Sequence, residues 1–396
     1  MSFVYVVTKS SPPVLVGPSG PTPAVTIRPT STDMSRLGRS STSFHVFEGR
    51  IHEPAETIRR ALSHALVHYY PFAGRVSGGD GKDVVFSCTG EGVVFVAATA
   101  KCTLEDVTEF ACGGFVVGVT WNHGLADGFG LAQFLCAVGE LARGLPSPSV
   151  VPVMYDESLP DIPQLFNLLR QSAAGFKPEH VDFAYCDVTI PWSFVNLVKA
   201  EFSSRIAGRR CSVFEVVTAA IWQSRTRAID GHLGGSLAPL VFAANVRKHV
   251  GAKDGYYGNC ITSQLVAATG DAVADGDIVD VVKLIKDAKE RIPELLAKKQ
   301  LAAVVEDGLV EALCGYSALY LSSWAGIGFD GVDFGGGRPA RVMPNMEVLM
   351  VPTCAPCLPC SRKDGVGVNV IASCVTDEHV DVFRAELARL FSGDPI

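Results

Sequence analysis

The 396-residue chain has no apolar run as long as a membrane-spanning helix needs, because Gly, Pro or a charged residue interrupts each one. Its first residues, from Met1 on, lack the basic region and apolar core of a secretory signal and the Arg- and Ser-rich pattern of a transit peptide. The basic residues form no long run, and the formal net charge is −7, which disfavours nucleic acid as a partner. We therefore expect a cytoplasmic monomer whose partners include neither a membrane nor nucleic acid.

The sequence also lacks the pattern of a disulfide framework. Its twelve cysteines are scattered, many of them inside apolar runs, where a thiol behaves as a small hydrophobic group. One cluster, Cys354-x-x-Cys357-x-x-Cys360 with Cys374 beyond it, raises the alternative of a metal site. Prolines alternate with these cysteines where a metal site would need turns that glycine permits, so we expect structural thiols and no metal.

The chain is 48% hydrophobic and 19% charged, which suffices to bury the cores of two ordinary domains. The spacing of apolar residues predicts helices over 54–69, 131–141, 193–202, 212–228, 277–291 and 377–390. Apolar and β-branched runs predict strands over 115–121, 239–246 and 367–375, and a hairpin of 84–86 with 93–96. Ser212 followed by Glu215 predicts a capping box. The pattern indicates an α/β fold with mixed sheets, and the Pro-rich stretch 146–163 predicts a crossover between two domains, 1–165 and 166–396.

Chemistry is concentrated where the strand ending near Trp121 gives way to an apolar helix. The intervening segment reads Asn122-His123-Gly124-Leu125-Ala126-Asp127-Gly128. A histidine at such a junction projects from a rigid strand end, and its ordinary pKa lies close to neutral, as a general base requires. Asp127 follows four residues later, at the start of the helix.

Taken alone, His-x-x-x-Asp is a weak signal, because nine histidines and frequent aspartates make one accidental match unsurprising. The segment Gly315-Tyr-Ser-Ala-Leu319 lacks the closing glycine of a hydrolase nucleophile elbow, which disfavours a hydrolase. Acyl transfer from a thioester needs less: a base for the acceptor's proton and donors for the oxyanion, with no metal and no covalent intermediate.

Four motifs occur together with the order and spacing of one family. They are Tyr70–Arg75, His123–Gly128, Gly255–Cys260 and Val332–Pro339. This set resembles the plant BAHD acyltransferases over nearly the whole chain. The resemblance implies two domains of chloramphenicol-acetyltransferase-like fold, each a mixed β-sheet flanked by helices, joined by a crossover loop. It places the catalytic histidine in the first domain and the Asp-Phe-Gly motif in the second, with a channel between them for CoA and the acceptor.

Individual roles follow from the same resemblance. His123 matches the catalytic histidine. Asp127 matches an aspartate that pairs with an arginine, here Arg247, and supports the histidine structurally, while Asp333 and Gly335 belong to a second structural motif. The family's usual tryptophan in that motif is replaced by Gly336, and the connector 103–108 is short.

Two further groups match segments that reach substrates in relatives. Ser322 and Trp324 are candidate oxyanion donors, although Trp324 is equally well explained as a packed aromatic. Arg209, Arg210 and Ser212 resemble a CoA-binding edge, with basic side chains and a helix N-terminus for the phosphates. The alternative for the two arginines is an exposed pair without a ligand.

The implied reaction uses acyl-CoA as co-substrate and no permanently bound cofactor. The segment Val7–Pro13 and the Tyr256-Tyr257 variant look closest to polyamine hydroxycinnamoyltransferases and related benzoyl and acetyl transferases, so we expect a hydroxycinnamoyl group to be moved to an amine such as spermidine. Glu306, Asp307 and Glu311 are candidates to hold the ammonium, unless they form a solvated helix face. The alternative is O-acylation of an alcohol by benzoyl-, acetyl- or hydroxycinnamoyl-CoA. A catalytically silent binding protein is a third possibility, which the intact His123 disfavours.

Overall fold

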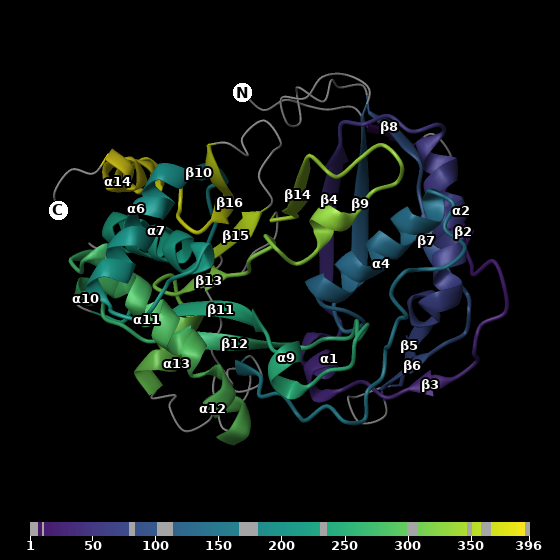
Figure 1. Ribbon diagram of the computed structural model, residues 1–396, viewed down its shortest axis with the longest axis horizontal. Helices are drawn as coiled ribbons and strands as arrows, with labels where there is room; N and C mark the ends of the chain where they lie inside the picture. Colours follow the sequence, from purple (N-terminus) through teal and green to yellow (C-terminus); the bar gives the residue numbers. More distant parts are fainter. Residues whose placement is uncertain are drawn as a thin grey trace. The chain divides into compact units, whose positions relative to one another are not determined.

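The computed structural model describes residues 7–9, 12–78, 84–100, 114–165, 181–229, 236–298, 307–346, 351–357 and 366–392 (Figure 1). The chain divides into two compact units. Unit 1 takes the chain up to Asp161 together with Val250–Cys260 and Gly326–Val342, and unit 2 takes Ile162–His249, Ile261–Ala325 and the chain from Met343 on. This differs from the expected division into 1–165 and 166–396, because two later segments, one of them with the Asp333 motif, return to unit 1.

Unit 2 is built on a six-stranded mixed sheet in the order β10-β16-β15-β13-β11-β12. The strands are β10 (Cys186–Pro191), β16 (Gly367–Ser373), β15 (Thr353–Cys357), β13 (Leu319–Leu321), β11 (Leu240–Asn245) and β12 (Ile261–Val266). β13 runs parallel to β11 and β15, and the other pairs are antiparallel. The sheet therefore has the mixed character that the sequence predicts.

Helices cover both faces of this sheet. In β11, Leu240 and Phe242 face one core and Val241 faces another, as the two-residue period of a strand requires. The first core is shared with α6 (Trp192–Arg205), α7 (Val213–Ala228), α10 (Gly270–Ala274), α11 (Ile278–Glu290) and α14 (Val380–Ser392), which lie together in Figure 1. The second is shared with α13 (Asp307–Cys314). Two short helices, α9 (Arg247–Val250) and α12 (Ile292–Lys298), complete the helices described after β10.

The helix α7 begins with the capping box that the sequence predicts. The Ser212 hydroxyl accepts from the Glu215 backbone N–H, and the Glu215 carboxylate accepts from the Ser212 backbone N–H at 2.7 Å. Two of the orphan donors of the first turn are satisfied in this way. The prediction is confirmed, and α7, buried on nearly every side, packs against α6, α10, α11 and α14.

Unit 1 has smaller sheets around two packed helices. Its main sheet has the order β14-β4-β9, formed by β14 (Arg341–Pro344), β4 (Ser40–Phe47) and β9 (Phe115–Asn122). The remaining strands are β1 (Val7–Lys9) with β8 (Ala98–Ala100), β2 (Val14–Val16) with β7 (Val93–Phe95), and β3 (Thr26–Ile27) with β6 (Val85–Ser87) and β5 (Arg75–Ser77). The helices are α1 (Ser31–Arg36), α2 (Pro54–His68), α4 (Gly128–Ala142) and the 3-10 turns η1 (Tyr70–Ala73) and η3 (Phe329–Gly331). α2 packs against α4.

The predicted hairpin of 84–86 with 93–96 is wrong. Both strands exist, but β6 pairs with β3 and β5, whereas β7 pairs with β2. The connecting turn is held by other parts of the chain, because the Gly92 N–H donates to the Ala73 carbonyl at 2.9 Å and a Cβ at Gly92 would lie 2.3 Å from the Val16 carbonyl oxygen. These long-range contacts direct the two strands to different partners.

Two glycines of α4 explain why later segments join unit 1. A Cβ at Gly130 would lie 1.8 Å from the Tyr257 carbonyl oxygen, and one at Gly139 would lie 2.5 Å from the Asp333 carbonyl oxygen. Only glycine allows a backbone to approach a helix so closely. The helix that follows His123 is therefore the surface on which the Gly255–Cys260 and Val332–Pro339 motifs pack.

Burial of His45 on β4 predicts an acid-sensitive fold. Its Nε2 lies 2.9 Å from the Ser43 hydroxyl, its ring packs edge-on against Phe329, and burial lowers its pKa to about 3. Below about pH 6.5 the His45 side chain binds a proton in the unfolded chain but not in the folded protein. The contribution of His45 to the free energy of unfolding is therefore complete above about pH 6.5. It falls as the pH drops toward 3, by up to about 1.4 kcal/mol per pH unit. Urea unfolding at pH 7.5 and pH 5 should show a smaller pH dependence for His45→Phe than for the wild type. Equal dependence in both proteins would contradict this assignment.

Candidate active site

The end of β9 presents His123 in a tight, hydrogen-bonded turn. The His123 backbone N–H donates to the Arg39 carbonyl at 2.8 Å, and the Asn122 side chain accepts from the Gly124 N–H at 2.9 Å. The Leu125 N–H closes the turn on the Asn122 carbonyl at 3.0 Å. His123 is half-buried, and these hydrogen bonds fix the backbone that carries its ring.

The ring contacts a residue that sequence reasoning did not single out. Nδ1 of His123 lies 3.2 Å from Oδ1 of Asn259, which is buried. Nδ2 of Asn259 donates to the His123 carbonyl at 2.8 Å and to the Asp33 carboxylate at 2.9 Å. Asn259 belongs to the quoted Gly255–Cys260 motif, and Asp33 follows Thr30 by three residues, the spacing of a helix cap, but nothing local indicates that either reaches His123.

The environment keeps the imidazole neutral. Burial is the largest cause that lowers the pKa of His123, to about 4, and the cation of Arg36 lowers it further. Hydrogen bonds with its own backbone and with Asn259, and the charge of Asp127, act in the opposite direction. At neutral pH the ring is therefore uncharged, with one nitrogen protonated and the other able to accept a proton.

Asp127 ties the histidine turn to its surroundings. Its buried carboxylate caps α4 through the Gly130 N–H at 3.0 Å and accepts from the Cys260 N–H at 2.9 Å. The charge of Asp127 also counteracts the effect of burial, which lowers the pKa of Arg36 to about 10. These contacts fit the structural role that was predicted. Arg247 is the first residue of α9, and the predicted pairing of Arg247 with Asp127 stays a prediction.

The Asp333 segment forms a turn on the other end of α4. Its carboxylate accepts from the N–H groups of Gly335 at 2.7 Å and Gly337 at 2.9 Å, and it lies 3.8 Å from the Arg143 guanidinium. Gly335 has a φ of 111°, a conformation that glycine adopts readily and other residues rarely do. The segment thus has structural contacts within unit 1 and anchors its loop to α4.

Ser322 and Trp324 lie at the end of β13 in unit 2. Their backbone N–H groups donate to the carbonyls of Cys354 at 3.0 Å and Pro356 at 2.7 Å. The Trp324 ring is partly buried against Ala355, Cys357 and Ile371. These contacts account for Trp324 as a packed aromatic, and the predicted oxyanion role of both residues stays a prediction.

The predicted CoA-binding residues have partners within unit 2. Arg209 forms ion pairs with Asp287 and Glu290, and the amine of Lys289 lies 3.4 Å from the Ser212 hydroxyl. Hydrogen bonds to Asp287 are the largest cause that raises the pKa of Arg209. Arg210 is exposed. CoA phosphates would have to compete with two carboxylates for Arg209, so its role remains a prediction.

The acidic residues around Glu311 and the cysteines around Cys354 were the candidates for an ammonium site and a metal site. Glu311 is exposed on α13, and Glu306 lies outside the described residues, as does Cys360. Cys354 and Cys374 are buried thiols. Within the described ranges, no group of three or more His, Cys, Asp or Glu side chains is placed to hold a metal ion. No helix in that part of the chain is both long and apolar enough to cross a membrane.

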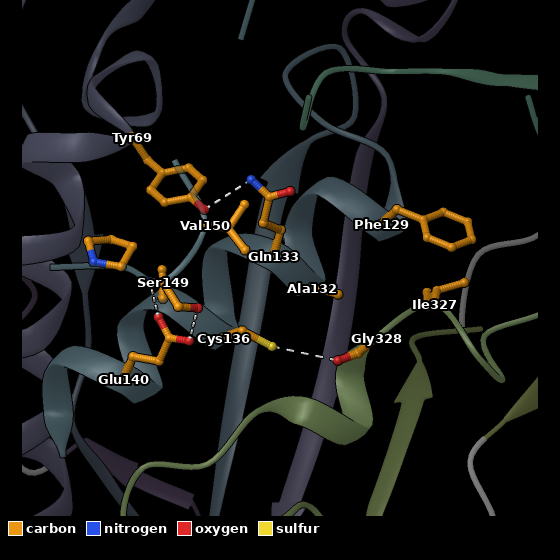
Figure 2. A pocket seen from close by; sticks show the side chains of 12 residues that line it. Tyr69, Phe129, Ala132, Gln133, Cys136, Glu140, Ser149, Val150, Ile327 and Gly328 are labelled. Carbon is orange, nitrogen blue, oxygen red and sulfur yellow. Dashed lines mark hydrogen bonds between the residues drawn. The ribbon is translucent and has the colours of Figure 1, made fainter. Parts of the chain in front are cut away.

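A separate cavity of about 220 Å³ lies along α4 (Figure 2). The Gln133 amide donates to the Tyr69 hydroxyl at 3.1 Å, and the Cys136 thiol contacts the Gly328 carbonyl at 3.6 Å. Burial raises the pKa of Cys136 to about 11 and that of Tyr69 to about 12, so neither ionises near neutral pH. His123 is not among the described residues that line this cavity.

Comparison with known proteins gives consistent matches over nearly the whole chain. The model of the family described as "Transferase family" matches residues 6–107 and 104–390. Acyl transferase 15 of Oryza sativa subsp. japonica is 40% identical, over 97% of this chain and 99% of that protein. Myricetin 3-O-glucosyl 1,2-rhamnoside 6'-O-caffeoyltransferase AT1 of Crocosmia x crocosmiiflora is 33% identical, over 98% of this chain and 99% of that protein.

Solved structures agree on the fold. Vinorine synthase superposes with a TM-score of 0.70 at 18% identity, over 97% of this chain and 98% of that one. TRI101 of F. graminearum, complexed with coenzyme A and T-2 mycotoxin, gives a TM-score of 0.66 at 16% identity, over 92% and 99%. The chain thus has the two-domain chloramphenicol-acetyltransferase-like fold. It belongs to the plant BAHD family of acyl-CoA-dependent acyltransferases.

Proposed function

We propose that this protein transfers a hydroxycinnamoyl group from CoA to a hydroxyl of a small-molecule acceptor, with His123 as the general base. The observation that carries the proposal is a neutral imidazole on a half-buried residue, whose Nδ1 faces Asn259. The proposal assigns the other ring nitrogen, Nε2, to the acceptor. Nε2 takes the proton as the acceptor oxygen attacks the thioester carbonyl carbon. The oxyanion then collapses, the C–S bond breaks, and the CoA thiolate takes the proton from the imidazolium. In this proposal Ser322 and Trp324 stabilise the oxyanion, and Arg209, Arg210 and Ser212 bind CoA.

Two arguments favour a hydroxyl over the amine that the sequence suggested. An aliphatic amine has an ordinary pKa near about 10.4 and is largely protonated at neutral pH, so an amine acceptor needs an acidic group that holds its ammonium. Glu311, a candidate to hold that ammonium, is exposed on α13 as a solvated helix face would be. The caffeoyltransferase relative, which is named for O-acylation, supports both the donor class and the hydroxyl.

The test compares acceptors with one donor. Purified protein and p-coumaroyl-CoA are mixed with a myricetin glycoside, an aliphatic alcohol or spermidine, and thiol release is followed while mass spectrometry identifies the product. Thiol release that depends on a hydroxyl acceptor, with an ester product, is expected. If an amide of spermidine is the sole product, the acceptor is a polyamine and not a hydroxyl compound. If no acceptor gives an acyl product, the result favours a catalytically silent binding protein. We also propose that the protein is a cytoplasmic monomer. Size-exclusion chromatography of the same sample tests the oligomeric state.

A further inference from the structure

We propose that Asp33 is a positioning residue for His123: it holds the Asn259 amide in the one orientation that keeps the ring proton on Nδ1 and leaves Nε2 as the base. The effect on catalysis rests on the proposed function. The tautomer of His123 rests on geometry alone and is measured separately.

The orientation of the Asn259 amide is set by three oxygens around one of its two terminal atoms. That atom lies 2.9 Å from Oδ1 of Asp33, 2.8 Å from the His123 carbonyl oxygen and 3.3 Å from the Gly124 carbonyl oxygen. A backbone carbonyl has no proton to donate, and neither does a carboxylate. The atom is therefore the amide nitrogen, since an oxygen there would face three other oxygens in a buried site.

The tautomer of His123 follows from this orientation. With the nitrogen of Asn259 directed to those oxygens, its Oδ1 faces Nδ1 of His123 at 3.2 Å. An amide oxygen only accepts hydrogen bonds, so Nδ1 must carry the proton. In a neutral ring with Nδ1 protonated, the lone pair available for proton abstraction is on Nε2.

The Asp33 carboxylate fits the role of a fixed acceptor. It is buried, and three N–H groups converge on it: the Thr30 backbone at 2.9 Å, the Asn259 backbone at 3.3 Å and the Asn259 side chain at 2.9 Å. Each of these N–H groups needs a lone pair of the carboxylate. Burial is the largest cause acting on Asp33 and raises its pKa, while these hydrogen bonds act in the opposite direction. The charged groups that act on the histidine itself are Arg36 and Asp127.

The same carboxylate fixes its own helix. Thr30 and Asp33 form a reciprocal capping box at the start of α1, with the Asp33 N–H 3.1 Å from the Thr30 hydroxyl. One oxygen of the Asp33 carboxylate, Oδ2, takes part in this cap, and the other, Oδ1, accepts from Asn259. The side chain of Asn259 contacts both the Asp33 carboxylate and the His123 ring, so Asn259 is the bridge through which Asp33 acts.

The direct test is the tautomer of His123 by nitrogen-15 NMR. Long-range proton–nitrogen spectra are recorded at pH 7.5 on protein with labelled histidine, and the His123 signals are assigned by their loss in His123→Gln. The wild type is expected to show a protonated Nδ1 and an unprotonated Nε2. Asp33→Leu, which removes one of the three acceptors of the Asn259 nitrogen and leaves the two backbone carbonyls, should shift part of the ring population to the tautomer protonated on Nε2. Asp33→Asn, which keeps an oxygen toward Asn259, should preserve most of the wild-type pattern.

Kinetics provide the second readout. Asp33→Leu should lower kcat by about tenfold to a hundredfold, as loss of an orienting partner does elsewhere, with the KM for acyl-CoA little changed, and Asp33→Asn should recover most of that loss. Thr30→Val is the control, since it weakens the cap of α1 but leaves the Asn259 contact. It should lower the unfolding midpoint without altering the His123 spectrum.

Three results would overturn the inference: a protonated Nε2 in the wild type, an unchanged tautomer in folded Asp33→Leu, or an equal loss of kcat in Asp33→Leu and Asp33→Asn with unchanged spectra. If Asp33→Leu does not fold, the wild-type and Asp33→Asn spectra still decide. A confirmed tautomer together with near-normal activity of His123→Ala would instead reject the base role in the proposed function and leave the positioning contact intact.

Discussion

Replacement of His123 with alanine is expected to lower kcat by about a hundredfold to ten-thousandfold, because general base catalysis typically supplies an acceleration of that size. The variant loses the only ring whose nitrogen is held by Asn259 in the described site. The backbone N–H of His123 donates to the Arg39 carbonyl and its backbone carbonyl accepts from Asn259, so both contacts remain available to alanine. Single-turnover measurements with p-coumaroyl-CoA and a hydroxyl acceptor give the rate of the chemical step directly.

The controls separate chemistry from binding and folding. Calorimetric titration with CoA should give a similar dissociation constant for wild type and His123→Ala, and the unfolding midpoints should differ little. His123→Gln keeps a polar side chain of similar length but offers no base, and it should be as slow as the alanine variant. A folded His123→Ala protein with near-normal kcat would remove the base assignment.

Replacement of Asp127 with alanine is expected to reduce stability and activity together. The variant loses the cap of α4, worth about 1 kcal/mol, and removes the acceptor of a buried Cys260 N–H, which costs about 1–3 kcal/mol more. It also removes a negative charge that acts on the buried Arg36. The free energy of unfolding should therefore fall by about 2–4 kcal/mol. Urea unfolding followed by tryptophan fluorescence, in parallel with the acyl-transfer assay, measures both effects.

Asp127→Asn is the matched variant, because its amide oxygen replaces one of the two acceptors, toward either Gly130 or Cys260. It should lie between the wild type and Asp127→Ala in both stability and activity. Full stability of Asp127→Ala with selective loss of catalysis would contradict the structural role. That result would place the carboxylate among the groups that act on the substrate.

Local patterns in the sequence predicted most helices and several strands. The apolar spacing over 54–69 corresponds to α2 (Pro54–His68), and the run 239–246 corresponds to β11 (Leu240–Asn245). Ser212 with Glu215 gave a confirmed capping box. These features depend on residues three or four positions apart, so a window of the sequence contains their physical cause. The motif set also identified the family, because order and spacing along the chain are properties of the sequence itself.

The surroundings of His123 could not be predicted in the same way. The sequence singled out His123 and Asp127, which are four residues apart, but not Asn259, which contacts the ring from 136 positions away. Nor did it single out Asp33, which binds Asn259 and lies 90 positions before His123. The partners of β6 and β7 were likewise decided by Ala73 and Val16 rather than by the turn between the strands. The sequence by itself determined most of the helices, the family and the choice of His123 as the candidate base. Only the tertiary structure decided which strands pair, which motifs pack on α4 and which side chains orient that imidazole, because contacts between distant residues depend on how the whole chain buries its apolar surface.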